Sequence, residues 1–219
     1  MAAERLDIDP EELDISNVRQ VEHTSGSKVG EIVINDHLAN GAGFTVWLAN
    51  HWKEILKSIT TPAPRANSFI GAIISATHRS ACDSSCYDCL RQYRNMSYHG
   101  LLDWRLGLSL LRCMSDDSFQ CGLDGDFSLP DLENWLSFAT SQRDIFCASF
   151  SSCTPYEFGP LPGFVVGGQQ VIVVYPLWDT LRPTDYLAEA FAVCETAPKF
   201  LDTSNMLRRP SGAYQWLGE

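Results

Sequence analysis

A short block of histidine and cysteine constrains this chain more than any other feature of its sequence. His78, Cys82, Cys86 and Cys89 are separated by three, three and two residues. A Cys-x2-Cys pair lets two thiolates reach one metal from a tight turn, and ligands placed one helical turn earlier can complete a tetrahedron. Because three cysteines with one histidine are common in structural zinc sites, we predict Zn²⁺ rather than an iron–sulfur cluster.

Other interpretations of this block stay open from the sequence alone. His99 is an alternative fourth ligand, and Cys113 is a weaker one. The cysteines could also be a buried group of thiols without a metal, since free cysteines often behave as small core residues. A redox Cys-x-x-Cys fits less well, because the motif does not open a helix after a strand.

The charge balance of the chain is acidic but uneven. The 219 residues include 16 Lys and Arg against 27 Asp and Glu, a formal net charge of −11, and such a field opposes stand-alone binding to nucleic-acid phosphates. Between Arg79 and Arg112, however, five arginines stand against three acids, which allows a local basic face.

The beginning of the sequence is polar and acidic, which is unlike a signal peptide. No apolar run approaches the roughly 20 residues of a membrane span. We therefore predict a cytoplasmic protein, in which an even count of eight cysteines is only weak evidence for disulfides.

Hydrophobic periodicity predicts a mixed α/β (α+β) fold, a small mixed sheet flanked by helices, with the zinc knuckle as an insertion. Strands are expected at 29–34 and 200–202, and a β-hairpin at 164–175, turning at Gly167 and Gly168. Helical spacing predicts helices over 43–58, 101–114, 130–150 and 184–194.

Composition divides the chain into three predicted parts. Residues 1–28 are an acidic lead-in, and residues 29–150 form the metal-binding domain with its cysteine block at 78–95. Residues 151–219 are a C-terminal α/β extension packed on the same domain. The boundary at 151–162 rests on its proline and glycine content.

A glycine-rich turn, Asn40-Gly41-Ala42-Gly43, stands between a predicted strand and a predicted helix. It could cradle a phosphate on backbone N–H groups, although a tight turn explains the same glycines. A Gly-x4-Gly-Lys-[Ser/Thr] loop and a Gly-x-Ser-x-Gly elbow are both missing from the sequence. We therefore predict no catalytic residues and no ATPase activity.

Arginines and aromatic residues alternate after the cysteine block. Arg91, Arg94 and Arg105 lie among tyrosines and Trp104, a mixture that suits phosphate contact and base stacking. In the alternative interpretation Trp104 is core and the arginines pair with nearby aspartates. The pair Arg208-Arg209 could also contact a phosphate, although a solvated pair is the default.

Three blocks of the sequence share a pattern with a known family. They are a strand with Asp and a Gly-Ala-Gly turn (30–44), the cysteine block (78–95), and His99-Gly-Leu-Leu-Asp-Trp-Arg-Leu (99–106). On these blocks the chain resembles the C-terminal metal-binding domain of MrfA/YprA-like superfamily-two helicases, also found in the DISARM defence protein DrmB. Segments 173–179 and 202–210 resemble the tail of some defence-associated members. The family usually offers four cysteines where this block has three, which leaves the fourth ligand open.

The resemblance implies a zinc-binding accessory subunit that docks on a superfamily-two DNA helicase, a translocase or another defence-complex subunit. The setting would be bacterial phage defence or DNA repair, with DNA contacted through the complex. The helicase motor itself is missing, because neither a nucleotide-binding loop nor a downstream acidic box is found. Two alternatives remain: a stand-alone nuclease or hydrolase using His37, His51 or a cysteine outside the block, and a direct nucleic-acid-binding zinc protein.

Overall fold

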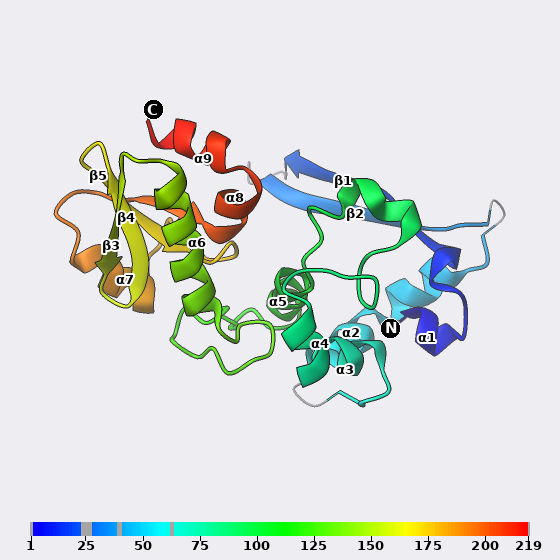
Figure 1. The fold of residues 1–219 in the computed structure, drawn as a ribbon. Coiled ribbons are helices and arrows are strands. Elements are labelled where there is room, and N and C mark those ends of the chain that lie inside the picture. Colours follow the sequence, from blue (N-terminus) through cyan, green and yellow to red (C-terminus); the bar gives the residue numbers. More distant parts are fainter. Residues whose placement is uncertain (1, 23–27, 39–40, 62–63, 219) are drawn as a thin grey trace. The chain divides into compact units, whose positions relative to one another are not determined.

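The computed structural model describes residues 2–22, 28–38, 41–61 and 64–218 (Figure 1). The chain divides into two compact units, Met1–Ala72 and Ile73–Glu219. Helices combine with a two-stranded and a four-stranded sheet, so the predicted mixed α/β class is confirmed. The division at 72/73 differs from the boundaries predicted from composition. The predicted boundary at 28/29 falls inside the second strand of a β-hairpin, and the one at 150/151 falls between a helix and the strand that follows it.

The first unit consists of a hairpin and helices. Strand β1 (Leu13–Glu22) pairs antiparallel with β2 (Lys28–Asp36). A long amphipathic helix, α2 (Phe44–Thr60), follows as predicted and buries one apolar face. The shorter helical elements are α1 (Ala2–Leu6), η1 (Pro10–Glu12) and α3 (Phe69–Ile73).

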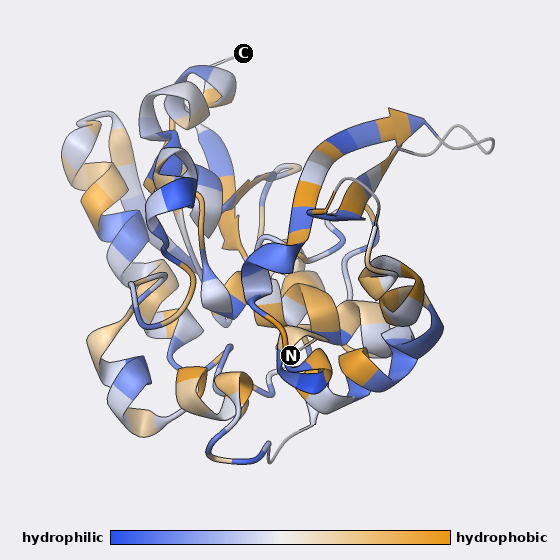
Figure 2. Cartoon of the chain, turned by 90° about the vertical axis from the view of Figure 1, so that its right-hand side faces the viewer, coloured by the Kyte–Doolittle hydropathy of each residue, from blue (hydrophilic) through white to orange (hydrophobic). Residues whose placement is uncertain are grey.

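Strand β1 lies within the predicted acidic lead-in, and here the structure differs from the prediction. Polar and apolar residues are interspersed along it, as the blue and orange stretches of the β1–β2 ribbon show in Figure 2. Val18 lies opposite Ile32, and both side chains stay largely exposed. An exposed ribbon of this kind carries many polar residues, and its composition is therefore similar to that of an unstructured tail.

The second unit is built on a four-stranded sheet in the order β3-β4-β5-β6. Strands β3 (Cys153–Phe158), β4 (Leu161–Val166) and β5 (Gln169–Val174) form an antiparallel meander. Helix α7 (Asp185–Ala192) then leads to β6 (Lys199–Asp202), which pairs with β5 in parallel. The predicted hairpin and last strand are confirmed. Because β5 and β6 are parallel, their carboxyl ends lie side by side.

Strand β3 occupies the segment that its proline and glycine content marked as a boundary. Pro155 lies within the strand, where it cannot donate a ladder hydrogen bond. The strand is at the edge of the sheet, so one side of its backbone needs no partner strand. A proline is therefore compatible with this position and does not mark the end of a domain.

Helix α6 (Trp135–Ser149) packs against β3 and β4 and covers the core of the second unit. It begins later than the predicted 130, because Asn134 adopts a left-handed φ of 62°. Phe158, Leu161 and Phe164 are completely buried, and the Phe164 ring contacts that of Phe146 on this helix. The other helical elements are α4 (Ala76–Ala81), η2 (Tyr93–Tyr98), α5 (Trp104–Ser115), α8 (Thr203–Arg208) and α9 (Pro210–Leu217).

Candidate metal centre

The four predicted metal ligands lie on a short helix and the turn that follows it, all within the second unit. Helix α4 begins after Ser75, whose hydroxyl accepts the His78 N–H, and it ends at Cys82. A tight turn follows in which the N–H groups of Cys89 and Arg91 both donate to the Cys86 carbonyl oxygen. The helix and the turn bring the His78 ring and the three thiols to one point.

The side-chain atoms of this group are close enough to share one ion. The ligand atoms of His78, Cys82, Cys86 and Cys89 all lie within 4.8 Å of one another. The Cys89 sulfur is 3.9 Å from that of Cys82 and 3.7 Å from that of Cys86. The Cys86 sulfur is 3.4 Å from the His78 Nε2 atom.

These spacings agree with the edges of a tetrahedron around zinc. Zn–S bonds of about 2.3 Å and Zn–N bonds of about 2.0 Å imply S···S edges of about 3.8 Å and S···N edges of about 3.5 Å. The donor set of three sulfurs and one imidazole nitrogen is one that zinc prefers. The group can therefore hold a metal ion, and its chemistry is consistent with zinc.

A second contact fixes the orientation of the His78 ring. Its Nδ1 atom lies 2.7 Å from the Ile73 carbonyl oxygen, which can only accept a hydrogen bond. Nδ1 therefore carries the proton, and Nε2 is left with the free lone pair that faces the Cys86 sulfur. A backbone carbonyl behind a ligating histidine is a frequent feature of protein metal sites.

The start of helix α5 is hydrogen-bonded to the cysteine turn. Trp104, its first residue, is buried, and its indole N–H donates to the Cys82 carbonyl oxygen over 3.2 Å. The Trp104 ring also contacts the His78 ring edge-on. The backbone N–H of Trp104 donates to the Ser84 carbonyl oxygen. The position of the turn is therefore tied to the start of α5, which Asp103 caps.

Two thiols of this group, those of Cys82 and Cys89, have a raised pKa. Burial raises the pKa of the Cys82 thiol to about 12, with further contributions from Cys86 and Cys89. Burial also raises the pKa of Cys89. Thiolates are the metal-binding form, so metal binding must release protons from both groups.

The two alternative fourth ligands lie elsewhere. The His99 Nε2 atom is 2.9 Å from Asn95 Oδ1 and 3.0 Å from the Gln92 carbonyl oxygen, in the η2 segment. The Cys113 sulfur lies 3.3 Å from that of Cys121, at the far end of α5. Neither belongs to the group formed by His78 and the three cysteines.

We expect His78→Ala to lower zinc affinity by about a hundredfold, because it removes one of four ligands. His99→Ala is the matched control and should leave zinc affinity unchanged, and His78→Cys should largely retain it. Competition titration of the purified variants against a chromophoric zinc chelator measures these affinities. Equal losses for His78→Ala and His99→Ala would contradict the assignment of the fourth ligand.

The glycine-rich turn does not offer a phosphate cradle in this structure. The Asp36 carboxylate accepts the backbone N–H groups of Ala42, Gly43 and Thr45 at 2.7–2.9 Å. Partial desolvation opposes the effect, but these donors hold the pKa of Asp36 below its usual value. The aspartate thus already fills the place of an anion at the start of α2, while Asn40 lies outside the described residues.

The three arginines predicted to contact nucleic acid differ in their surroundings. Arg91 donates to the hydroxyl of the buried Ser85, and Arg94 donates to Gln92 at the surface. Arg105 lies 4.4 Å from the centre of the Trp104 ring and donates to the carbonyl oxygens of Asp83 and Pro130. Trp104 is thus a core residue, as the alternative interpretation held.

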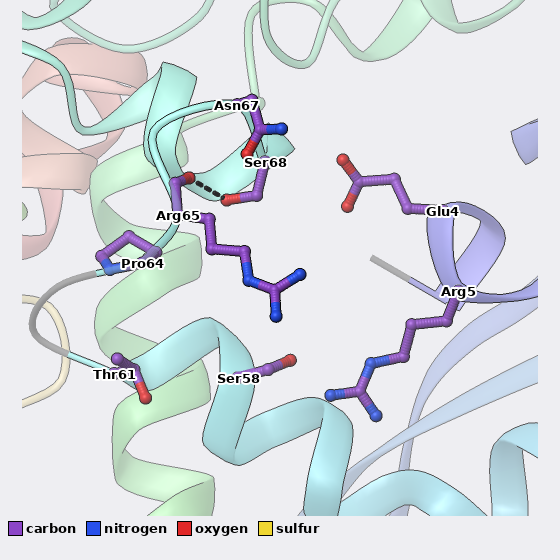
Figure 3. A pocket seen from close by; sticks show the side chains of 8 residues that line it. All are labelled: Glu4, Arg5, Ser58, Thr61, Pro64, Arg65, Asn67 and Ser68. Atoms are coloured by element: carbon purple, nitrogen blue, oxygen red, sulfur yellow. Dashed lines mark hydrogen bonds between the residues drawn. The ribbon is translucent and has the colours of Figure 1, made fainter.

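The histidines considered for hydrolysis lie in the first unit. His51 stacks on Trp47, and its Nδ1 atom lies 2.8 Å from the Trp47 carbonyl oxygen. The same unit has a cavity of about 660 Å³. Figure 3 shows the guanidinium groups of Arg5 and Arg65 extending into it. Neither histidine lines this cavity.

A buried polar network in the second unit was not predicted from the sequence. Asp131 accepts hydrogen bonds from Ser109 and Arg112 of α5, and Tyr175, after β5, donates to Ser109. The Asp131 side chain has no exposed surface. Because Asp131 is one of many acids between 116 and 144, no sequence signal distinguishes it from its solvated neighbours.

Comparison with protein family models, with curated proteins and with solved structures gives no match. Within the described residues, none of the helices combines the length and apolar character that crossing a membrane requires. The geometry of the His/Cys3 group is therefore the strongest functional observation on this chain.

Proposed function

We propose that this chain is a zinc-binding accessory module that docks on a superfamily-two DNA helicase or translocase, in bacterial phage defence or DNA repair. The observation that carries the metal assignment is the convergence of His78, Cys82, Cys86 and Cys89 at tetrahedral spacings. Four protein ligands leave no open position for a substrate, which is typical of structural zinc. Bound zinc would cross-link the turn, and we assign it no role in a reaction.

The docking part of the proposal is supported by sequence blocks rather than by the metal site. The strand with its glycine turn, the cysteine block and the start of α5 all follow the pattern of the helicase-associated domain described above. A net charge of −11 also favours a protein partner with a basic surface over bare DNA. In this arrangement the chain supplies a folded module, and the partner supplies the ATP-driven motor.

A surface beside the metal centre favours DNA contact as a second role of the docked module. Tyr87, Tyr93 and Tyr98 are all exposed, and Tyr93 keeps 87% of its surface accessible. Arg94 lies among them on η2. Exposed aromatic rings next to an arginine suit the stacking of unpaired bases and contact with phosphate.

Co-expression with the superfamily-two helicase encoded nearest to this chain tests both roles. We expect the two proteins to co-purify with zinc, and the chain alone to show no ATPase activity. Replacing Tyr93 and Arg94 with alanine should leave assembly and thermal stability unchanged and lower the DNA affinity of the complex, with a smaller salt slope. Arg91→Ala is the structural comparison, because its partner Ser85 is buried.

Failure of the two proteins to associate at micromolar concentration, with zinc bound, would contradict docking. A double variant that assembles and binds DNA as tightly as the parent complex would contradict the contact surface. ATP hydrolysis by the purified chain without a partner would contradict the accessory role, because phosphoryl transfer needs a phosphate-binding loop and a magnesium carboxylate.

A further inference from the structure

A second cavity lies in the second unit, beyond the carboxyl ends of strands β5 and β6. Its volume is about 460 Å³, within the range of about 300–1,000 Å³ that is usual for small-molecule sites. The parallel strands β5 and β6 both end here, and the residues that follow them, Tyr175 and Thr203, line the cavity. Ligands of α/β proteins commonly bind beyond the carboxyl ends of parallel strands.

One wall of this cavity is apolar and open to a planar group. Trp135 and Phe138 contribute to it from α6, and Leu207 contributes from α8. Phe138 is 39% exposed and Leu207 is 47% exposed, although both belong to helices that pack on each other. Two large apolar side chains are thus available to a ring that enters the cavity.

Charged side chains line the rest of the cavity: Arg79, Arg105 and Arg208, together with Asp83, Asp103, Asp131 and Glu133. Glu133 pairs with Arg79, and Asp131 pairs with Arg112. Arg105 donates to the backbone carbonyl oxygens of Asp83 and Pro130, which carry no net charge. Arg208 lies 3.5 Å from an Asp103 carboxylate oxygen, at the limit of a hydrogen bond. A guanidinium has five N–H donors, so both groups keep donors for an anion.

Two further N–H groups on residues of the cavity wall have no acceptor among the described residues. They are the indole N–H of Trp135 and the Nε–H of Arg79, and both are buried. A buried donor without an acceptor is destabilising. Such groups favour a ligand that is rich in acceptor atoms over a wholly apolar one.

We propose that this cavity binds a nucleotide, with the base against Phe138 and Leu207 and the phosphate between Arg105 and Arg208. An inorganic anion would use the arginines alone, and an apolar ligand would leave them unused. The side-chain amides of Asn134 and Gln142 also line the cavity and can bond the polar edge of a base. Binding of this kind goes beyond docking on a helicase and does not depend on it.

The same chemistry is offered by a free mononucleotide and by the terminal nucleotide of a single strand. Calorimetric titration of the zinc-loaded chain with deoxyadenosine monophosphate, deoxyadenosine and inorganic phosphate tests the shared chemistry. We expect the monophosphate to bind more tightly than either fragment. A short 5′-phosphorylated single strand that binds more tightly still would identify the source as a strand end, and equal or weaker binding would identify the free nucleotide.

Three substitutions test the two halves of the site. Arg208→Gln should weaken monophosphate binding about tenfold, because a charged hydrogen bond is lost. Phe138→Ala should weaken it about fivefold and leave binding of inorganic phosphate unchanged. Asp103→Asn should strengthen it about threefold, because a negative charge near the phosphate is removed while asparagine can still cap α5.

The control is Arg182→Gln, which removes one exposed arginine that does not line the cavity. It should bind the monophosphate as the parent does. Absence of binding in the folded, zinc-loaded parent, or equal affinities for the Arg208→Gln and Arg182→Gln variants, would overturn the nucleotide assignment. Thermal melting of each variant confirms that a loss of binding is not a loss of folding.

Discussion

Removal of zinc, by a chelator or by Cys86→Ser, is expected to unfold the segment from the end of α4 to the start of α5. Few buried side chains hold this segment, because Cys82 and Ser85 are the only buried residues described between 82 and 103. Structural zinc contributes on the order of 10 kcal/mol to local folding. Hydrogen exchange should therefore become fast across 82–103, and the melting temperature should fall sharply.

Cys194→Ser is the matched control for the loss of a cysteine. The Cys194 thiol is partly exposed and donates to the Ala190 carbonyl oxygen, near the end of α7. We expect metal content and melting temperature to stay close to those of the parent. If the metal-free protein kept slow exchange across 82–103, or if Cys86→Ser retained one zinc per chain, the metal centre would not be the support of this segment.

The second large effect is expected at Asp131, whose side chain is completely buried. Asp131→Ala should lower the free energy of unfolding by about 3–5 kcal/mol, because it leaves the Arg112 charge buried without its carboxylate. The Arg112 side chain is only 7% exposed and cannot turn to water easily. Chemical denaturation monitored by tryptophan fluorescence measures the change.

An acid in the same loop provides the comparison for this substitution. Asp126 lies at the surface, where it accepts the Ser128 N–H, so Asp126→Ala should cost less than about 1 kcal/mol. Combining Asp131→Leu with Arg112→Met should cost less than the sum of the two single changes, because the pair is then removed together. Additive losses would mean that Asp131 and Arg112 are not energetically coupled.

The parts of the molecule that could be predicted from the sequence are those formed by residues close together along the chain. The β4–β5 hairpin follows from an apolar run on each side of Gly167 and Gly168, both of which adopt a positive φ. The convergence of His78 with the cysteines could be predicted because α4 and one turn suffice to bring them together. In each case neighbours along the chain determine the arrangement.

The parts that could not be predicted depend on contacts between distant residues. Strand β3 contains Pro155, and only its place at the sheet edge makes that residue compatible with a strand. Asp131 gains its importance from Ser109 and Arg112, about one element earlier in the chain. Arg105 likewise donates to the carbonyl oxygen of Pro130, which is 25 residues away along the chain. The residues around Arg105 do not predict this contact.

The four ligands are close together along the chain, and this affects the order in which parts of the protein can fold during synthesis. All of them lie between His78 and Cys89, so the loop that the metal closes is short and its closure costs little entropy. Chains emerge from the ribosome N-terminus first, and β5 must wait for β6 to complete its parallel pair. A metal ion bound by these four residues would therefore be captured during synthesis, before the sheet exists.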